Sequence, residues 1–149
     1  MPAAPASASR RFSIAALILL LLLALADIAW LLTATGWLYR PQLGALLNPA
    51  PVLWAAISFY LLYWFGLCLF VLRPALAAGS AWLACGLGAA FGLVAYGTYD
   101  LTNQATIVGW PALVTFIDMA WGSLLSATSC GLACALAQRF TANRANPQL

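Results

Sequence analysis

Four long apolar runs separated by short polar segments make up most of the chain. The runs cover residues 12–34, 52–72, 78–101 and 112–137. A helix needs about 20 apolar residues to cross the hydrocarbon core of a bilayer, and each run reaches that length. The pattern therefore predicts an all-α fold, a four-helix bundle in which each run forms one transmembrane helix.

The polar segments between the runs carry residues that end or redirect helices. Residues 36–51 contain Trp, Tyr and Pro; the two aromatic types favour the membrane–water interface, and Pro favours the first turn of a helix. We expect a short interfacial segment here. The Arg73-Pro74 pair is expected to end the second span, and residues 103–111 to form the turn before the fourth.

The composition indicates that lipid is the main solvent of this chain. It is 65% hydrophobic and 6% charged, with no His, whereas a soluble domain has about 25% charged residues. Without His, the chain cannot build a His-rich di-iron site, a His-ligated haem or a Ser-His-Asp triad. The arginines form no basic patch, so nucleic acid is not an expected partner. No cofactor and no metal site is expected.

The first apolar run has two interpretations. Arg10-Arg11, a Leu-rich core from Ile14 to Leu23 and the Ala24-Leu25-Ala26 triplet fit a secretory signal peptide, with a hint of a twin-arginine signal. However, the apolar run continues past Ala26 to Leu32. This continuation favours an uncleaved first span, with residues 1–11 and 139–149 as tails on either side of one transmembrane domain, 12–138.

The arginines predict the orientation of the bundle. Segments on the cytoplasmic side of a membrane carry an excess of Lys and Arg. If both termini are cytoplasmic, that side holds five arginines and the outer side holds one. The five are Arg10, Arg11, Arg73, Arg139 and Arg144, and the one is Arg40. We therefore expect a multi-pass protein of the bacterial inner membrane with both termini in the cytoplasm.

The three acids, Asp27, Asp100 and Asp118, all lie within or at the edge of predicted spans. An ionisable group at mid-bilayer costs about 2.5–3.5 kcal/mol and marks a functional site by default. The directions of the helices place all three carboxyl groups in the outer half of the membrane, where we expect them to cluster. Burial and mutual repulsion both favour the neutral form of a carboxyl group. At least one of the three is therefore expected to be protonated at neutral pH.

Aromatic and polar residues accompany each acid. Asp27-Ile-Ala-Trp30 and Asp118-Met-Ala-Trp121 repeat one motif, whose i, i+3 spacing puts the carboxyl and the indole on one helical face. The remaining candidate site residues surround Asp100 or supply the outer cation: Tyr96, Tyr99, Asn103, Gln104 and Arg40. Carboxyl groups among aromatic rings suit a cationic or hydroxylated amphipathic ligand and also suit acid–base chemistry on a lipid.

Small residues and cysteines indicate packing. Gly88-x-x-x-Gly92, and a stripe of Ser123, Ala127, Gly131 and Ala135, permit close contact with a neighbouring helix, within the chain or in a homodimer. The four cysteines lie within spans and are expected to behave as buried thiols.

Several motifs together resemble a known family. They are Asp27-x-x-Trp30-Leu31, Tyr39 with Leu43-Gly44, Phe59-Tyr60-Leu61-Leu62-Tyr63, Pro74-Ala75-Leu76, Tyr96-x-Thr98-Tyr99-Asp100-Leu101-Thr102-Asn103, Trp110-Pro111 and Asp118-x-x-Trp121-Gly122. From Phe12 to Leu136 the chain resembles a family of small bacterial four-span membrane proteins, a domain of unknown function. The resemblance implies four spans and a retained first helix, and it supplies no activity. A looser similarity, in architecture alone, is to the four-span sterol-isomerase and sigma-2-receptor group.

These observations lead to one functional hypothesis with two alternatives. The first is an intramembrane site of carboxyl and aromatic groups that binds or acts on a lipid or an amphipathic small molecule. The second is a small proton-coupled transporter that works as a dimer. The third is a structural or accessory membrane subunit. Whether the protein is an enzyme stays open at this point.

Overall fold

The computed structural model describes residues 5–142, so Arg144 and the outer parts of both predicted tails lie outside the described residues. Within this range the chain is helical and contains no strand. Four of its helical segments are long and apolar enough to cross a membrane. The predicted all-α, four-helix membrane bundle is confirmed.

The helical segments follow one another with short connections. Their bounds are α1 (Pro5–Ala34), the π-helix η1 (Thr35–Tyr39), α2 (Arg40–Leu43), the 3₁₀-helix η2 (Gly44–Leu46), α3 (Leu53–Leu67), the π-helix η3 (Cys68–Leu72), α4 (Arg73–Ala77), α5 (Ala81–Thr106) and α6 (Ala112–Ala142). The segments α1 to η2 form the first span, α3 to α4 the second, α5 the third and α6 the fourth.

Both π-helices directly precede an Arg-Pro pair. The N–H of Arg40 bonds the carbonyl of Thr35, and the N–H of Arg73 bonds that of Cys68, in each case five residues back. A proline cannot donate to the carbonyl four residues earlier and its ring crowds that carbonyl, so a wider π turn before it accommodates the ring. The helices therefore pass through Pro41 and Pro74. The second span continues to Ala77 instead of ending at the Arg-Pro pair.

Helix α5 also runs further than its apolar pattern suggests. It continues beyond Leu101 to Thr106. The hydroxyl groups of Thr98, Thr102 and Thr106 each donate to the carbonyl four residues earlier, at 2.7, 2.5 and 2.7 Å. These polar side chains are thus satisfied by their own helix. Because α5 extends to Thr106, Asn103 and Gln104 are helical and do not lie in the turn.

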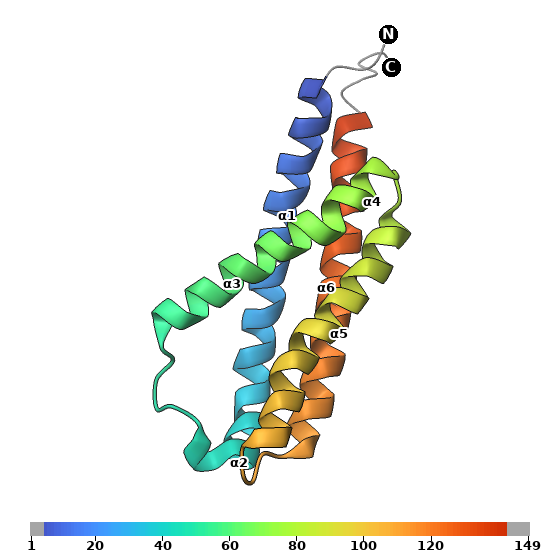
Figure 1. Ribbon diagram of the computed structural model, residues 1–149. Coiled ribbons are helices and arrows are strands. Elements are labelled where there is room, and N and C mark those ends of the chain that lie inside the picture. The colour runs from blue at the N-terminus through green and yellow to red at the C-terminus, as the bar shows by residue number, and fades with distance from the viewer. Residues whose placement is uncertain (1–4, 143–149) are drawn as a thin grey trace.

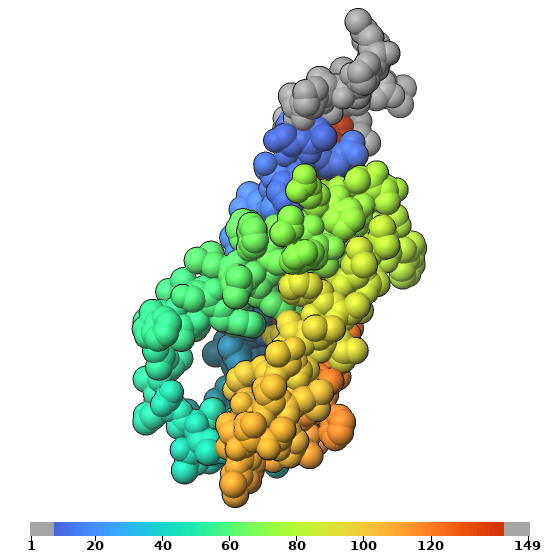
Figure 2. Space-filling view, viewed as in Figure 1, coloured from blue at the N-terminus to red at the C-terminus, as the bar shows by residue number. Residues whose placement is uncertain are grey.

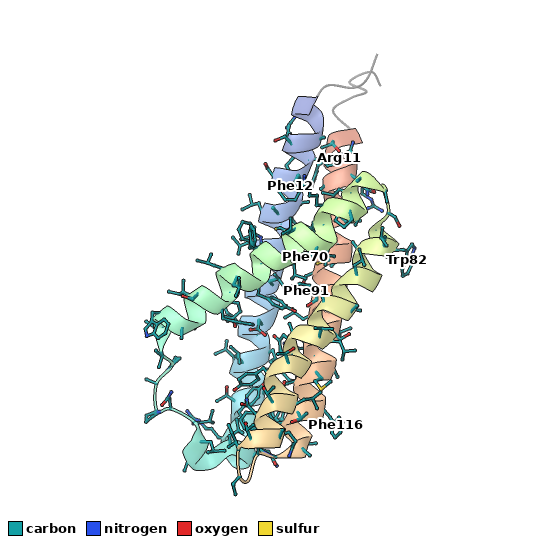
Figure 3. All side chains as sticks on the ribbon, in the orientation of Figure 1. Arg11, Phe12, Phe70, Trp82, Phe91 and Phe116 are labelled. Carbon is teal, nitrogen blue, oxygen red and sulfur yellow. The ribbon has the colours of Figure 1, made fainter. Side chains whose placement is uncertain are left out.

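The first, third and fourth spans run side by side, and the second span crosses them. In Figure 1, α1, α5 and α6 are roughly aligned, while α3 runs diagonally and its N-terminal end lies away from the other helices. The N-terminal end of α1 and the C-terminal end of α6 lie at the same end of the bundle as α4. Helix α2 lies at the other end, with the α5–α6 turn. Where η3, which continues α3, passes α5, the rings of Phe70 and Phe91 stack with centroids 6.2 Å apart (Figure 3).

Helices α5 and α6 form the closest pair, and glycines make this possible. A Cβ added at Gly88 would lie 2.6 Å from the carbonyl oxygen of Ser126, and one added at Gly92 would collide with the backbone of Gly122. The Gly88-x-x-x-Gly92 face is therefore occupied within the chain. A homodimer stays a prediction, and it needs another face.

Two apolar clusters lie at different depths. The larger one joins α1, the second span and α6, with Leu19, Leu67, Leu72 and Cys130 fully buried. The smaller one lies at the α2 end and includes Leu38 and Trp110. All four cysteines are free thiols, and three of them are buried.

We predict that Gly92→Ala destabilises the protein, because the new methyl group collides with the α6 backbone. Overpacking of this kind costs about 1–3 kcal/mol. The matched control is Gly86→Ala in the same helix, where nothing lies within 4 Å of the added Cβ; it is expected to be neutral or to stabilise by up to about 1 kcal/mol. Unfolding free energies in detergent check both. Equal effects of the two substitutions would contradict the close α5–α6 contact.

Candidate functional site

The two Asp-x-Ala-Trp motifs meet and bond crosswise. The indole N–H of Trp121, in α6, donates to Oδ1 of Asp27, in α1, at 3.0 Å. The rings of Trp30 and Trp121 stack with centroids 4.5 Å apart and planes 11° apart. Neither indole N–H bonds the carboxylate of its own motif: that of Trp121 bonds Asp27, and that of Trp30 bonds Tyr39.

Tyr39 connects the first span to the other acid, Asp118 in α6. The indole N–H of Trp30 donates to the hydroxyl of Tyr39 at 2.9 Å, and this hydroxyl donates to Oδ1 of Asp118 at 2.6 Å. Tyr39 is the last residue of the π-helix η1, so the wider turn before Pro41 carries the phenol that reaches α6. Asp27 and Asp118 are thus linked by a continuous path of side chains, Asp27–Trp121–Trp30–Tyr39–Asp118.

Helix α3 adds a second donor to Asp27. The hydroxyl of Tyr60 donates to Oδ2 of Asp27, so both carboxylate oxygens of this residue accept a hydrogen bond. One turn further along α3, the hydroxyls of Tyr63 and Ser126 lie 2.5 Å apart. The crossing helix α3 is therefore attached to α1 and α6 through its tyrosines. Sequence analysis missed Tyr39 and Tyr60 as site residues. For Tyr60, the available signal was its spacing of three residues from Tyr63 in a span that carries no charge.

A cavity of 340 Å³ lies beside this network. It is lined by Phe59, Ala95, Tyr96, Tyr99 and Asp118, from α3, α5 and α6. Figure 2 shows the surface hollowed between α3 and α5, with α1 visible at the back of the hollow. Oδ1 of Asp118 accepts from Tyr39, whereas Oδ2 has no hydrogen bond to any described residue. Asp118 is the acid that both belongs to the network and faces the cavity.

Asp100 differs from the other two acids in its hydrogen bonding. It is 0% exposed, and neither of its carboxyl oxygens has a hydrogen-bond partner among the residues described. Burying a carboxyl group without a partner is costly. The expectation that one of the three acids is protonated stays a prediction. Asp100 is the natural place for that proton, because Asp27 and Asp118 both accept hydrogen bonds.

The other predicted residues divide between the cavity and the α5–α6 turn. Tyr96 and Tyr99 form cavity walls. Gln104, in the last turn of α5, bonds residues on the far side of the connection to α6: its amide donates to the carbonyl of Trp110 at 3.2 Å, and its Oε1 accepts from Thr115 at 3.2 Å. Asn103 is half-buried and Arg40 is exposed. No hydrogen bond joins either residue to a carboxylate in the part of the chain that the structure describes.

The structure therefore brings together six of the predicted site residues. Asp27, Asp118, Trp30 and Trp121 form the bonded network, and Tyr96 and Tyr99 line the cavity beside it. Asp100, Asn103, Gln104 and Arg40 are not bonded to that network. The assembled group can accept hydrogen bonds from a ligand at Asp118 and offers it aromatic faces at α3 and α5.

We predict that Trp121→Phe lowers the free energy of unfolding by about 1–3 kcal/mol, because Oδ1 of Asp27 then loses its donor while it stays buried. Trp82→Phe is the matched control: Trp82 is 86% exposed, and the change should stay within about 0.5 kcal/mol. Thermal or denaturant unfolding in detergent measures both. A loss no greater for Trp121 than for Trp82 would rule out the Asp27–Trp121 bond.

Comparison with known proteins identifies a family. The family described as "Predicted membrane protein (DUF2177)" matches residues 12–135. Neither the curated proteins nor the solved structures contain a match. The matched region covers the second and third spans completely and most of the first and fourth, and it includes Asp27, Trp30, Tyr39, Tyr60, Asp118, Trp121 and every residue that lines the 340 Å³ cavity. The chain belongs to the DUF2177 family of predicted membrane proteins.

Proposed function

We propose that this protein binds, or acts on, a lipid or an amphipathic small molecule whose cationic or hydroxyl head group contacts Asp118. The observation that supports this most directly is the position of the Asp118 carboxylate. One oxygen is fixed by Tyr39, and the other has no partner among the described residues while the residue lines an aromatic cavity. A fixed acceptor in a mostly apolar cavity is typical of a small-molecule site.

The size and the walls of the cavity suit a small amphipathic ligand. Its volume of 340 Å³ is near the lower end of the usual range for ligand pockets, about 300–1,000 Å³. Phe59, Tyr96 and Tyr99 offer ring faces beside the carboxylate. Aromatic faces attract cations, most strongly where water is excluded. An alkylammonium group is therefore the favoured head group, and a hydroxyl group is the next.

The diagonal course of α3 suggests how a ligand enters from the membrane. The N-terminal end of α3 lies away from the other helices (Figure 1), and Phe59, on the cavity wall, is 46% exposed. A lateral entrance between α3 and α5 lets a molecule that is dissolved in the bilayer reach Asp118 without crossing the bundle.

One observation favours proton-coupled transport as a second candidate. The buried, unpartnered carboxyl of Asp100 has the chemistry of an intramembrane proton carrier. Flux in proteoliposomes separates the two functions: a transporter loses its pH-dependent flux in Asp100→Asn, whereas a binding protein shows no flux in either form.

A set of photoactivatable probes tests the proposed site. The probes share one alkyl chain and differ in the head group, which is a primary amine, a hydroxyl or a phosphate. In phosphatidylcholine nanodiscs, we expect the amine probe to label α3 and α5 most strongly around Phe59, Tyr96 and Tyr99. Asp118→Asn should reduce this labelling about tenfold, because a charged hydrogen bond contributes about 1.5–3 kcal/mol.

The control is Phe116→Ala, in the same helix but with a side chain that is 69% exposed. This variant should label like the wild type. Labelling that ignores the head group, or that survives Asp118→Asn, would refute the proposed site. If the site holds, a change in the lipid profile of cells carrying Asp118→Asn indicates that the protein acts on its ligand as well as binding it.

A further inference from the structure

A second cavity lies at the opposite end of the bundle. It has a volume of 610 Å³ and lies between the first turns of α1 and the stretch from the end of α3 to α4. Among the described residues that line it, only Arg11 and Arg73 are charged, and Phe12, Trp64, Phe65 and Leu69 are large apolar members of its wall. Figure 3 shows Arg11 and Phe12 at the same end of the bundle as α4.

The two arginines have no acidic side chain to pair with at this end. The chain contains three acids. Asp27 lies sixteen residues beyond Arg11 on α1, roughly 24 Å along the helix axis. Asp118 bonds Tyr39, beside the α2 end, and Asp100 is on α5 with no bonded partner. The Nε atom of Arg11 is itself buried without a hydrogen-bond partner among the described residues.

The walls of this cavity face lipid as well as the bundle. Phe65 is 58% exposed and Leu69 is 36% exposed, so the cavity opens on the membrane side of α3 and η3. Trp64 is fixed in place, because its indole N–H donates to the carbonyl of Ala16 at 2.9 Å. The site therefore combines a rigid apolar wall, an opening toward acyl chains and two guanidinium groups at one end.

We propose that this cavity binds an anionic glycerophospholipid, with the phosphodiester at Arg11 and Arg73 and one acyl chain along Phe12, Phe65 and Leu69. Guanidinium groups match phosphate oxygens in geometry as well as in charge. Basic pockets between transmembrane helices recognise anionic head groups. The positive-inside prediction places this end in the cytoplasmic leaflet. The site is separate from the carboxylate cavity and does not depend on it.

Native mass spectrometry of the full-length protein tests this proposal, with phosphatidylglycerol and phosphatidylcholine of matched chains as probes. We expect phosphatidylglycerol to be retained more strongly, by about fivefold for each arginine. The double variant Arg11→Gln/Arg73→Gln should reduce its retention to the level of phosphatidylcholine. Arg11→Lys/Arg73→Lys, which keeps the charges but loses the planar fork, should give an intermediate value and remains informative if the Gln variant does not fold.

The matched control is Arg10→Gln/Arg139→Gln, which removes two exposed charges from the same end without touching the cavity lining. It should retain phosphatidylglycerol like the wild type. Equal loss in this control would show diffuse attraction and overturn the proposal, as would equal retention of the two lipids. Deacylated glycerophosphoglycerol should not displace the lipid. Displacement at equal concentration would mean that the site binds a soluble phosphodiester, and this would overturn the lipid assignment.

Discussion

The need of the buried Asp27 and Asp118 carboxyl groups for hydrogen-bond donors from the protein organises the α2 half of the bundle. Water is scarce at this depth, and an unpaired polar group there costs several kcal/mol. Asp27 and Asp118 meet the requirement by an exchange between α1 and α6. Each helix supplies an acid and an indole, and the indoles stack between them. The pairing fixes both the register and the rotation of these two helices.

The position of the second span follows from the same requirement. One oxygen of Asp27 is satisfied by Tyr60, so α3 is held at its middle to α1, and Tyr63 extends the attachment to α6. Beyond these tyrosines, toward its N-terminal end, α3 leaves the bundle. The cavity beside Asp118 lies where that departure begins. The tilt of α3 therefore explains both its attachment to α1 and α6 through the tyrosines and the cavity beside Asp118.

The protein presents opposite chemistry at its two ends. The α2 end holds acids among aromatic rings, and the other end holds arginines beside apolar walls. The two Arg-Pro pairs contribute to both. In η1, the π turn before Pro41 carries Tyr39 toward Asp118, and in η3 the π turn before Pro74 places Arg73 at the rim of the second cavity.

Much of the architecture was predictable, because apolar run length alone fixes the number of spans. The convergence of Asp27, Trp30, Asp118 and Trp121 was also predictable, since i, i+3 spacing puts each pair on one face. The crosswise exchange was not, because it depends on how two helices rotate against each other. Tyr60 was missed because its role requires the tilt of α3. The Arg73-Pro74 pair was interpreted as the end of a helix, because local propensity alone does not reveal that a π turn can carry a helix through a proline.

A double-mutant cycle between Tyr39→Phe and Asp118→Asn tests most directly the hydrogen bonds that join the first span to α6. The unfolding free energy of each single variant, of the double variant and of the wild type would be measured in the same detergent. The two residues bond directly, so we predict a coupling energy of about 0.5–2 kcal/mol. Strictly additive effects, with a coupling energy below about 0.3 kcal/mol, would contradict the bonded path between the two acids.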